Sequence, residues 1–275
     1  MASLVPIILA FTAILGLAIG SFLNVVVWRV PRQLSLVAPA SACPSCGHSI
    51  RARDNVPVVS WLALGRKCRD CGEPISARYP LIEAGTAVFF VGVAFVLFEL
   101  GMPGLARSIA PWALAAFLYL AAVSVALAAI DLDLKRLPDR IVLPSIVVGA
   151  LLLAIATIGS SDWWMMGRAL IGGAALFLFY FLIVIVYPRG MGFGDVKLAA
   201  LLGLYLGWLG WGPLVVGAFA AFLAGGLFSI GLVIFRKASR KTAIPFGPWM
   251  LLGAWIGILF GTNISAGYLA IFGLS

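Results

Sequence analysis

The sequence predicts an all-α polytopic membrane protein of about eight transmembrane helices with one cytoplasmic, zinc-stapled loop subdomain. Hydrophobic residues make up 63% of the 275 positions and charged residues only 11%, whereas soluble domains average about 45–50% and about 25%. Mean hydropathy is +1.12. Apolar runs of the length that crosses a bilayer recur along the chain, and one polar segment interrupts them.

The first apolar run, residues 4–28, predicts a retained transmembrane helix. It has no basic stretch before it and is too long for a cleaved signal peptide. Within it, Gly16 and Gly20 have the spacing of two small residues that allows another helix to approach closely.

Residues 29–79 are the polar segment, and they predict a separate subdomain held by a metal. Two CxxC pairs, 21 residues apart, match a structural zinc site in which four thiolates close a tetrahedron. The proposed ligands are Cys43, Cys46, Cys68 and Cys71. Disulfides are the alternative, but a cytoplasmic segment is in a reducing compartment.

The remainder of this segment predicts a small core and short helices, because prolines and glycines interrupt it. His48, the single histidine, is either a substitute ligand or a surface residue, and four available thiols favour the surface. The expected core residues are Val58, Val59, Trp61 and Leu62.

Seven further apolar runs follow and form the transmembrane part of the chain. They predict spans at residues 80–100, 111–131, 140–158, 168–187, 195–209, 212–235 and 246–272. The run at 195–209 is the shortest. The expected domain organisation is therefore 1–28, 29–79 and 80–275.

The distribution of basic residues predicts how the chain is oriented in the membrane. If the polar segment is cytoplasmic, 17 of the 19 lysines and arginines lie on the cytoplasmic side, and only Arg107 and Arg168 lie outside. Cytoplasmic loops of membrane proteins carry this excess. Both termini are then periplasmic, and charge spread between apolar runs argues against nucleic acid as a partner.

Two aspartates at the ends of apolar runs are the candidate catalytic residues. Asp131 ends the run at 111–131, and Asp195 opens the run at 195–209. A carboxylate at membrane depth costs about 2.5–3.5 kcal/mol, so it is retained for a reason. Asp133 lies on the opposite helix face and is expected to meet solvent, while Asp139, after Pro138, is expected to cap the next helix.

A glycine-rich loop precedes Asp195. Gly192 and Gly194 permit close backbone approach, and irregular backbone at membrane depth is tolerated only beside protein or a wet cavity. The structural alternative is a glycine turn in which Asp195 caps the helix and Lys197 marks the inner membrane edge.

Gly192, Gly194 and Lys197 are candidates for the substrate face, and two further places share this prediction. Glu83 lies one turn inside the run at 80–100, where it either contacts substrate or compensates the helix dipole. Pro245 and Gly247 open the last run, which predicts either an extended entry that holds a peptide through main-chain hydrogen bonds or an ordinary helix start.

Paired carboxylates at the inner membrane boundary match aspartyl-protease chemistry. One ionised acid deprotonates water while the other, protonated, polarises the scissile carbonyl. The single histidine leaves no Ser/His/Asp set, and four thiolates leave a zinc ion no open position for catalysis. The natural substrate is a protein whose membrane segment follows a short cytoplasmic leader.

Motifs along nearly the whole chain resemble those of the type IV prepilin peptidases, inner-membrane aspartyl proteases of the GxGD type. The matching stretches are GSFLNVV from Gly20 to Arg29, the tetracysteine segment, NVP with SWL after Asn55, ISARYPLIE ending at Glu83, Ile130-Asp131 with Leu137-Pro138-Asp139, GFGDVK ending at Lys197, and Pro245-Phe246-Gly247-Pro248.

This resemblance implies cleavage of prepilins or pseudopilins at the bacterial inner membrane, with Asp131 and Asp195 as the catalytic pair. It also implies N-methylation of the new terminus with S-adenosylmethionine, although the 51-residue polar segment is too small for a Rossmann-type methyltransferase. Three alternatives stay open: a peptidase without methyltransferase activity, a proton-coupled transporter using paired aspartates, and a zinc-stapled scaffold.

Overall fold

The computed structural model describes residues 4–188, 190–235 and 244–273. In that part of the chain the regular structure is helical, and β pairing is limited to two isolated bridges, Ala42 with Ser49 and Lys67 with Pro74. The all-α prediction is therefore confirmed. The chain divides into two compact units, Met1–Glu99 and Leu100–Ser275.

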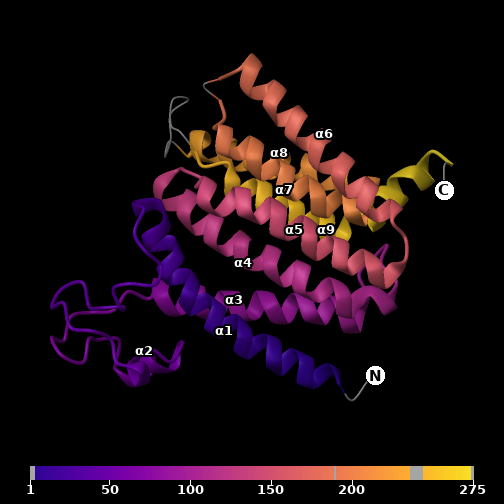
Figure 1. Ribbon diagram of the computed structural model, residues 1–275. Helices are drawn as coiled ribbons and strands as arrows, with labels where there is room; N and C mark the ends of the chain where they lie inside the picture. The colour runs from indigo at the N-terminus through magenta and orange to yellow at the C-terminus, as the bar shows by residue number, and fades with distance from the viewer. Residues whose placement is uncertain (1–3, 189, 236–243, 274–275) are drawn as a thin grey trace. The chain divides into compact units, whose positions relative to one another are not determined.

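The first unit contains two long helices joined by the polar segment (Figure 1). Its helices are α1 (Val5–Arg29), α2 (Val59–Ala63) and α3 (Arg78–Phe95), with 3-10 turns η1 (Val30–Arg32) and η2 (Ala52–Asp54). A π-helical turn, η3 (Val96–Leu100), continues α3. As expected, the polar segment holds no long helix among its residues.

Glycines bring α1 and α3 into backbone contact. A Cβ atom added at Gly16 would lie 2.5 Å from the Cα of Ala87, and one added at Gly20 would lie 2.6 Å from the Cα of Glu83. Such distances leave no room for a side chain. The close-packing prediction for this glycine pair is confirmed.

The polar segment buries less than expected. Val59 and Leu62 are 60% and 61% exposed, so the prediction that they belong to a core is wrong, and Trp61 and Val58 are only half-buried. The five-residue helix α2 cannot bury both of its faces, and the residue it buries is Ser60. The apolar core of this segment is therefore smaller than predicted.

The described residues of the second unit form a bundle of six long helices. After the 3-10 turn η4 (Arg107–Ile109) come α4 (Ala110–Leu134), α5 (Asp139–Ser160), α6 (Trp164–Val186), α7 (Phe193–Leu209), α8 (Trp211–Ile234) and α9 (Gly247–Ile271). Every predicted span corresponds to one helix, and apart from the end of α3 the starts and ends agree within four residues. Helix α3 ends at Phe95, and the π-helical turn η3 continues to the predicted end at residue 100. Helix α6 begins at Trp164, four residues before the predicted start at Arg168.

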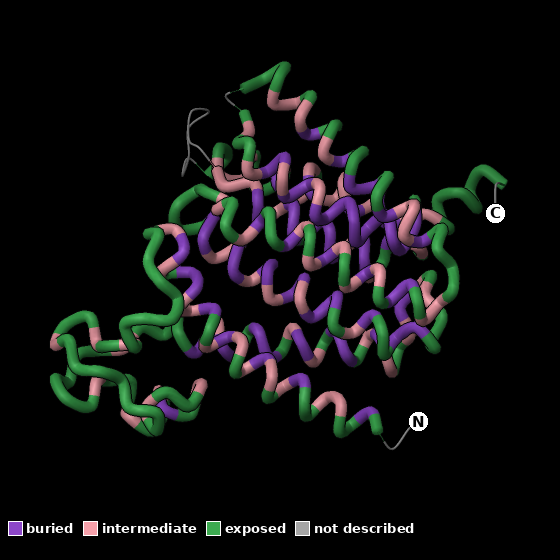
Figure 2. Tube along the Cα trace, in the orientation of Figure 1, coloured by how far each residue is buried: buried purple, intermediate pink, exposed green. Residues whose placement is uncertain are grey.

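Helix α7 lies inside this bundle, and after Phe193 none of its residues is exposed (Figure 2). Glycines again permit the approach, since a Cβ atom at Gly172 of α6 would lie 2.6 Å from the carbonyl oxygen of Gly203. Indole and phenol groups add hydrogen bonds between helices: Trp208 Nε1 to Thr157 Oγ1 (2.9 Å) and Tyr205 to the Ala116 carbonyl (3.0 Å). Such bonds help to hold helices together in lipid.

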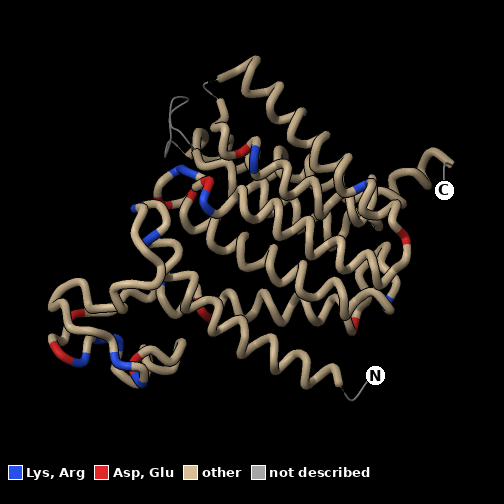
Figure 3. The backbone as a smooth tube through the Cα atoms, viewed as in Figure 1, with Lys and Arg blue, Asp and Glu red and all other residues tan. Residues whose placement is uncertain are grey.

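Among the described residues, seven helices are long and apolar enough to cross a membrane, which identifies a multi-pass membrane protein. The predicted span that is not among these seven is the sixth, α7, which has only 17 residues, at the lower end of the crossing length. In the second unit the charged residues gather near helix ends and leave the helix middles apolar (Figure 3).

Candidate active site

Asp131 lies in the last turn of α4 and is 4% exposed. The helix ends there because Lys135 takes a left-handed conformation (φ 51°) and donates its N–H to the Asp131 carbonyl at 2.8 Å. Asp131 Oδ2 accepts the backbone N–H of Gly247, at the start of α9, at 3.0 Å. A Cβ atom at residue 247 would lie 2.7 Å from this oxygen, so glycine is required for the contact.

Asp195 lies in the first turn of α7 and is 9% exposed. Its Oδ2 accepts the N–H of Gly192 at 3.1 Å, and its own N–H donates to the Gly192 carbonyl at 3.1 Å. The N-cap of α7 is Gly192, and Asp195, the third helical residue, accepts the N–H of this N-cap residue. The structural alternative is therefore correct in placing Asp195 in the capping contact, although Asp195 is not itself the N-cap.

The two aspartates share this arrangement. In each, Oδ2 is held by a backbone N–H, while no hydrogen bond from the described residues reaches Oδ1. Leu137 lies between Gly194 of α7 and Gly247 of α9. It is 3.0 Å from a Cβ placed on Gly194 and 3.3 Å from one placed on Gly247. The structure therefore brings Asp131 and Asp195 together at one end of the bundle, where Asp133 is exposed as expected.

The prediction that Asp139 caps α5 is wrong. Asp139 is the first residue of that helix, its N-cap is Pro138, and no side chain caps the helix end. Both carboxylate oxygens of Asp139 instead accept from Lys197 Nζ, at 2.7 and 2.8 Å. Lys197 is therefore more than a marker of the membrane edge.

The start of α9 is an ordinary helix start with one special contact. Helix α9 begins at Gly247 with Pro248 in its first turn, and Pro245 before it is half-buried. Phe246 packs against Phe222 and Tyr180, with ring centroids 5.3 and 6.4 Å away. Because the Gly247 N–H is bonded to Asp131, it is not free to hold a peptide.

Glu83 belongs to the first unit and is 8% exposed in α3. Its Oε2 accepts the N–H of Val58 at 2.7 Å, where the backbone is left-handed (φ 61°). This contact connects the polar segment to α3. The two roles expected for Glu83, substrate contact and compensation of the helix dipole, do not include it.

The four cysteines form one cluster. Their Sγ atoms all lie within 4.8 Å of one another, no disulfide joins them, and Cys43 and Cys71 are 3.8 Å apart. A tetrahedral site with Zn–S bonds of about 2.3 Å separates its sulfurs by about 3.8 Å. The cluster can hold a metal such as zinc, and His48 is exposed, as expected.

Each CxxC pair is built in the same way. Gly47 donates its N–H to the Cys43 carbonyl (2.9 Å), and Gly72 donates to the Cys68 carbonyl (3.0 Å). Both glycines are left-handed, with φ of 72° and 75°. The N–H groups of Cys46 and Ser45 lower the pKa of the Cys43 thiol to about 6, while desolvation and the neighbouring thiols raise the pKa of Cys46 and of Cys71.

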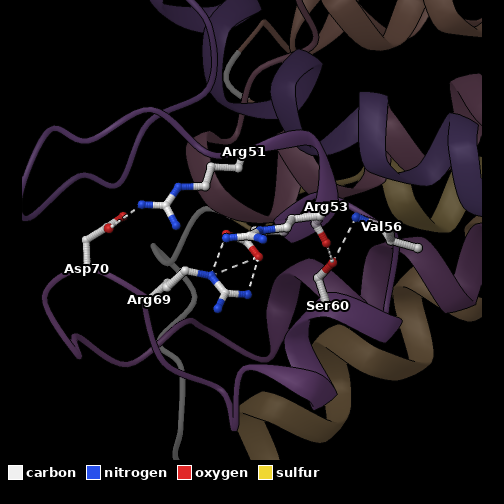
Figure 4. A network of polar contacts seen from close by, with 7 residues as sticks. Arg51, Arg53, Val56, Ser60, Arg69 and Asp70 are labelled. Carbon is white, nitrogen blue, oxygen red and sulfur yellow. Dashed lines mark hydrogen bonds and ion pairs between the residues drawn. The ribbon is translucent and has the colours of Figure 1, made fainter.

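Polar contacts connect the second cysteine pair to the rest of the segment (Figure 4). Arg69 donates to both oxygens of Asp54 at 2.6–3.1 Å, and Arg51 pairs with Asp70 at 3.0 Å. Ser60 Oγ donates to the Arg53 carbonyl (3.1 Å) and accepts from the Val56 N–H (2.9 Å). These bonds fix the loop that carries Cys68 and Cys71.

Comparison with known proteins finds a matching protein family for each of two regions of the chain. Residues 14–97 match the bacterial peptidase A24 N-terminal domain, and residues 118–230 match the type IV leader peptidase family. Prepilin leader peptidase/N-methyltransferases of Aeromonas hydrophila and Pseudomonas aeruginosa are 37% and 36% identical over 94% and 95% of this chain, and over 92% and 93% of their own lengths. The chain belongs to the type IV leader peptidase family. The relative from Pseudomonas putida is 35% identical over 96% of the chain and 95% of its own length, and no solved structure matches this family member.

Two features of the site have no signal in the sequence. The Gly247 N–H reaches Asp131 across 116 positions, and Lys197 reaches Asp139 across 58. Neither separation follows a helical period, so only the packing of α4, α5, α7 and α9 reveals them.

Proposed function

We propose that this chain is a prepilin leader peptidase with N-methyltransferase activity, and that Asp131 and Asp195 are its catalytic acids. The observation that carries the proposal is the pair of buried carboxylates, each with one oxygen held by a backbone N–H and the other without such a partner. Two adjacent carboxylates favour a state in which they share one proton. Family membership supports the same reaction class.

In this mechanism the ionised aspartate takes a proton from water, and the resulting hydroxide attacks the scissile carbonyl. The protonated aspartate donates a hydrogen bond to the carbonyl oxygen and stabilises the tetrahedral intermediate. Collapse breaks the C–N bond, and the proton taken from water passes to the leaving amine. The products are the leader peptide and a pilin or pseudopilin with a new amino terminus.

The test is cleavage of a purified prepilin by Asp131→Asn and Asp195→Asn variants. Each change keeps the side-chain shape and removes the acid, so we expect the rate to fall by about a hundredfold to ten-thousandfold. Asp133→Asn, two residues from the site and exposed, is the matched control and should cleave normally. Normal cleavage by either catalytic variant would refute the assignment.

We propose that the cysteine cluster holds one structural Zn²⁺. Four thiolates complete its coordination, so the ion orders the polar segment and takes no part in peptide hydrolysis. Metal analysis should find about one zinc per chain.

We propose S-adenosylmethionine as the methyl donor, whose sulfonium group supplies an electrophilic methyl group to the new amine. The first unit has a cavity of about 370 Å³ lined by Ala18, Ser21, Phe22, Val25, Ser41, Asn55 and Pro57. This volume is in the range of small-molecule sites, and the serine, asparagine and phenylalanine side chains can bond and stack against a nucleoside. Calorimetric binding of S-adenosylhomocysteine should weaken in Asn55→Ala while leader cleavage persists.

We propose that the aspartates face the cytoplasm of a bacterial inner membrane and that both termini are periplasmic. The support is the excess of lysine and arginine on one set of loops, although Arg189 and the basic residues at 236–241 lie outside the described residues. Labelling of single cysteines introduced at residues 133 and 162 in intact cells tests this orientation. An impermeant thiol reagent should reach only residue 162.

A further inference from the structure

The ion pair between Lys197 and Asp139 joins two helices at the end of the bundle that holds the aspartates. Lys197 Nζ lies 2.7 and 2.8 Å from the two oxygens of Asp139. The lysine side chain is 20% exposed and the aspartate side chain 56% exposed. An ion pair with so much solvent contact contributes little to overall stability, so a different reason for it is needed.

Two contacts direct the Lys197 side chain. Its ammonium binds the Asp139 carboxylate and lies 5.0 Å from the centroid of the Phe193 ring. Because Lys197 follows Asp195 by two residues in α7, the two side chains lie on different faces of this helix. The Lys197 ammonium is therefore directed away from the Asp195 carboxylate and toward α5.

The short connection from α4 to α5 is held at three points. At its start, Asp131 accepts the Gly247 N–H. In the middle, Leu137 packs against Gly194 and Gly247. At its end, Asp139 binds Lys197. The last contact makes a direct polar link between the chain segment that follows Asp131 and the helix that carries Asp195.

We propose that Lys197 and Asp139 are positioning residues that fix the separation of the two catalytic aspartates. Their ion pair sets where the first turn of α7 lies against the end of α4, and neither residue takes or gives a proton in the reaction. This inference rests on the proposed function, because it matters only if Asp131 and Asp195 act together.

The experiment is steady-state cleavage of a purified prepilin by Lys197→Met, Asp139→Asn and the double variant. Misplacing reacting groups by about 1 Å can cost about a hundredfold in rate, so we expect kcat to fall by about tenfold to a hundredfold with KM nearly unchanged. The double variant should be no slower than the slower single variant, since both remove one contact. Lys197→Arg, which can still bind the Asp139 carboxylate, should retain most activity.

Arg136→Met is the matched control, since it removes an exposed positive charge from the same connection. It should cleave normally, and all variants should keep the wild-type melting temperature. An increase in KM with unchanged kcat would assign Lys197 to substrate binding and overturn the proposal. Normal kcat in both single variants, or loss that follows a lower melting temperature, would also overturn it.

The Asp131→Asn and Asp195→Asn variants separate the two proposals. If these variants are inactive and Lys197→Met is normal, only the positioning role fails. If they cleave normally, the proposed function itself fails.

Discussion

The cysteine cluster and the aspartate site are both places where polar side chains converge, but the chain builds them differently. The cysteine cluster comes from two CxxC turns of one 29-residue stretch, each closed by its own glycine. The aspartate site needs α4, α5, α7 and α9, and its hydrogen bonds and ion pair cross up to 116 positions. Local turns define the first site, and helix packing defines the second.

This difference predicts how each site responds to change. A locally built site depends on its ligands and turns. It should lose its metal when a ligand is removed and should be insensitive to small movements of the long helices. A site assembled by packing should fail when a helix moves slightly, even if its chemical groups are untouched.

Replacing a cysteine should have the largest effect. Cys68→Ser leaves three thiolates, and structural zinc binding in small domains is worth about 10–16 kcal/mol. We expect bound zinc to fall from about one per chain to nearly none, as measured by atomic absorption. His48→Ala is the matched control, and a loss of zinc in that variant would make the histidine a ligand.

A single added methyl group should impair the aspartate site. In Gly247→Ala the new Cβ would lie 2.7 Å from Asp131 Oδ2 and displace the carboxylate. We expect cleavage to slow by about a hundredfold, or about 2.7 kcal/mol, with zinc content unchanged.

Gly267→Ala in the same helix is the control for this change, because nothing lies within 4 Å of its added Cβ. Equal rates for Gly247→Ala and Gly267→Ala would contradict the proposed dependence of the site on packing.

The contact between α1 and α3 should give a smaller effect. Gly20→Ala places a methyl group 2.6 Å from the Cα of Glu83, and overpacking of this kind costs about 1–3 kcal/mol. Thermal unfolding should occur at a lower temperature than in Gly92→Ala, whose Cβ meets nothing within 4 Å. Identical melting temperatures would show that the contact between α1 and α3 accommodates the added methyl group without loss of stability.

Removing the Arg69 side chain should have the smallest effect. The hydrogen bond from Arg69 lowers the pKa of Asp54 below its ordinary value, so the ion pair stabilises the folded segment at neutral pH. This contribution is present above the unfolded pKa of about 4 and is lost as the pH falls through the lower folded value. The melting temperature of Arg69→Met should therefore be slightly lower than that of wild type at pH 7, and this difference should become smaller in acid. Arg53→Met is the control.

The sequence predicts what depends on local pattern. Apolar run length placed every long helix, because membrane insertion selects for continuous apolar stretches. Spacing alone identified the four cysteines, and depth within an apolar run distinguished Asp131, now found buried, from the exposed Asp133. The catalytic roles of Asp131 and Asp195 stay predictions until variants are measured.

Predictions failed where a distant partner competes with a local rule. Asp139 after Pro138 matches a helix cap, but Asp139 is already the first residue of α5, and its carboxylate binds Lys197 of another helix. Glu83 accepts a hydrogen bond from the backbone of Val58, 25 positions away, which no local pattern in the sequence indicates. Val59 and Leu62 looked like core residues because apolar character does not tell how little surface a five-residue helix can cover.

The enclosure of α7 has a consequence for how this enzyme tolerates its lipid environment. Seventeen residues are too few to follow a thick bilayer, but a helix surrounded by protein does not have to match the acyl chains. The neighbouring helices adjust to a difference between hydrophobic length and bilayer thickness by tilting. The depth of Asp195 is then set by protein contacts rather than by lipid. Membranes of different thickness should therefore change the outer helices before they change the chemistry.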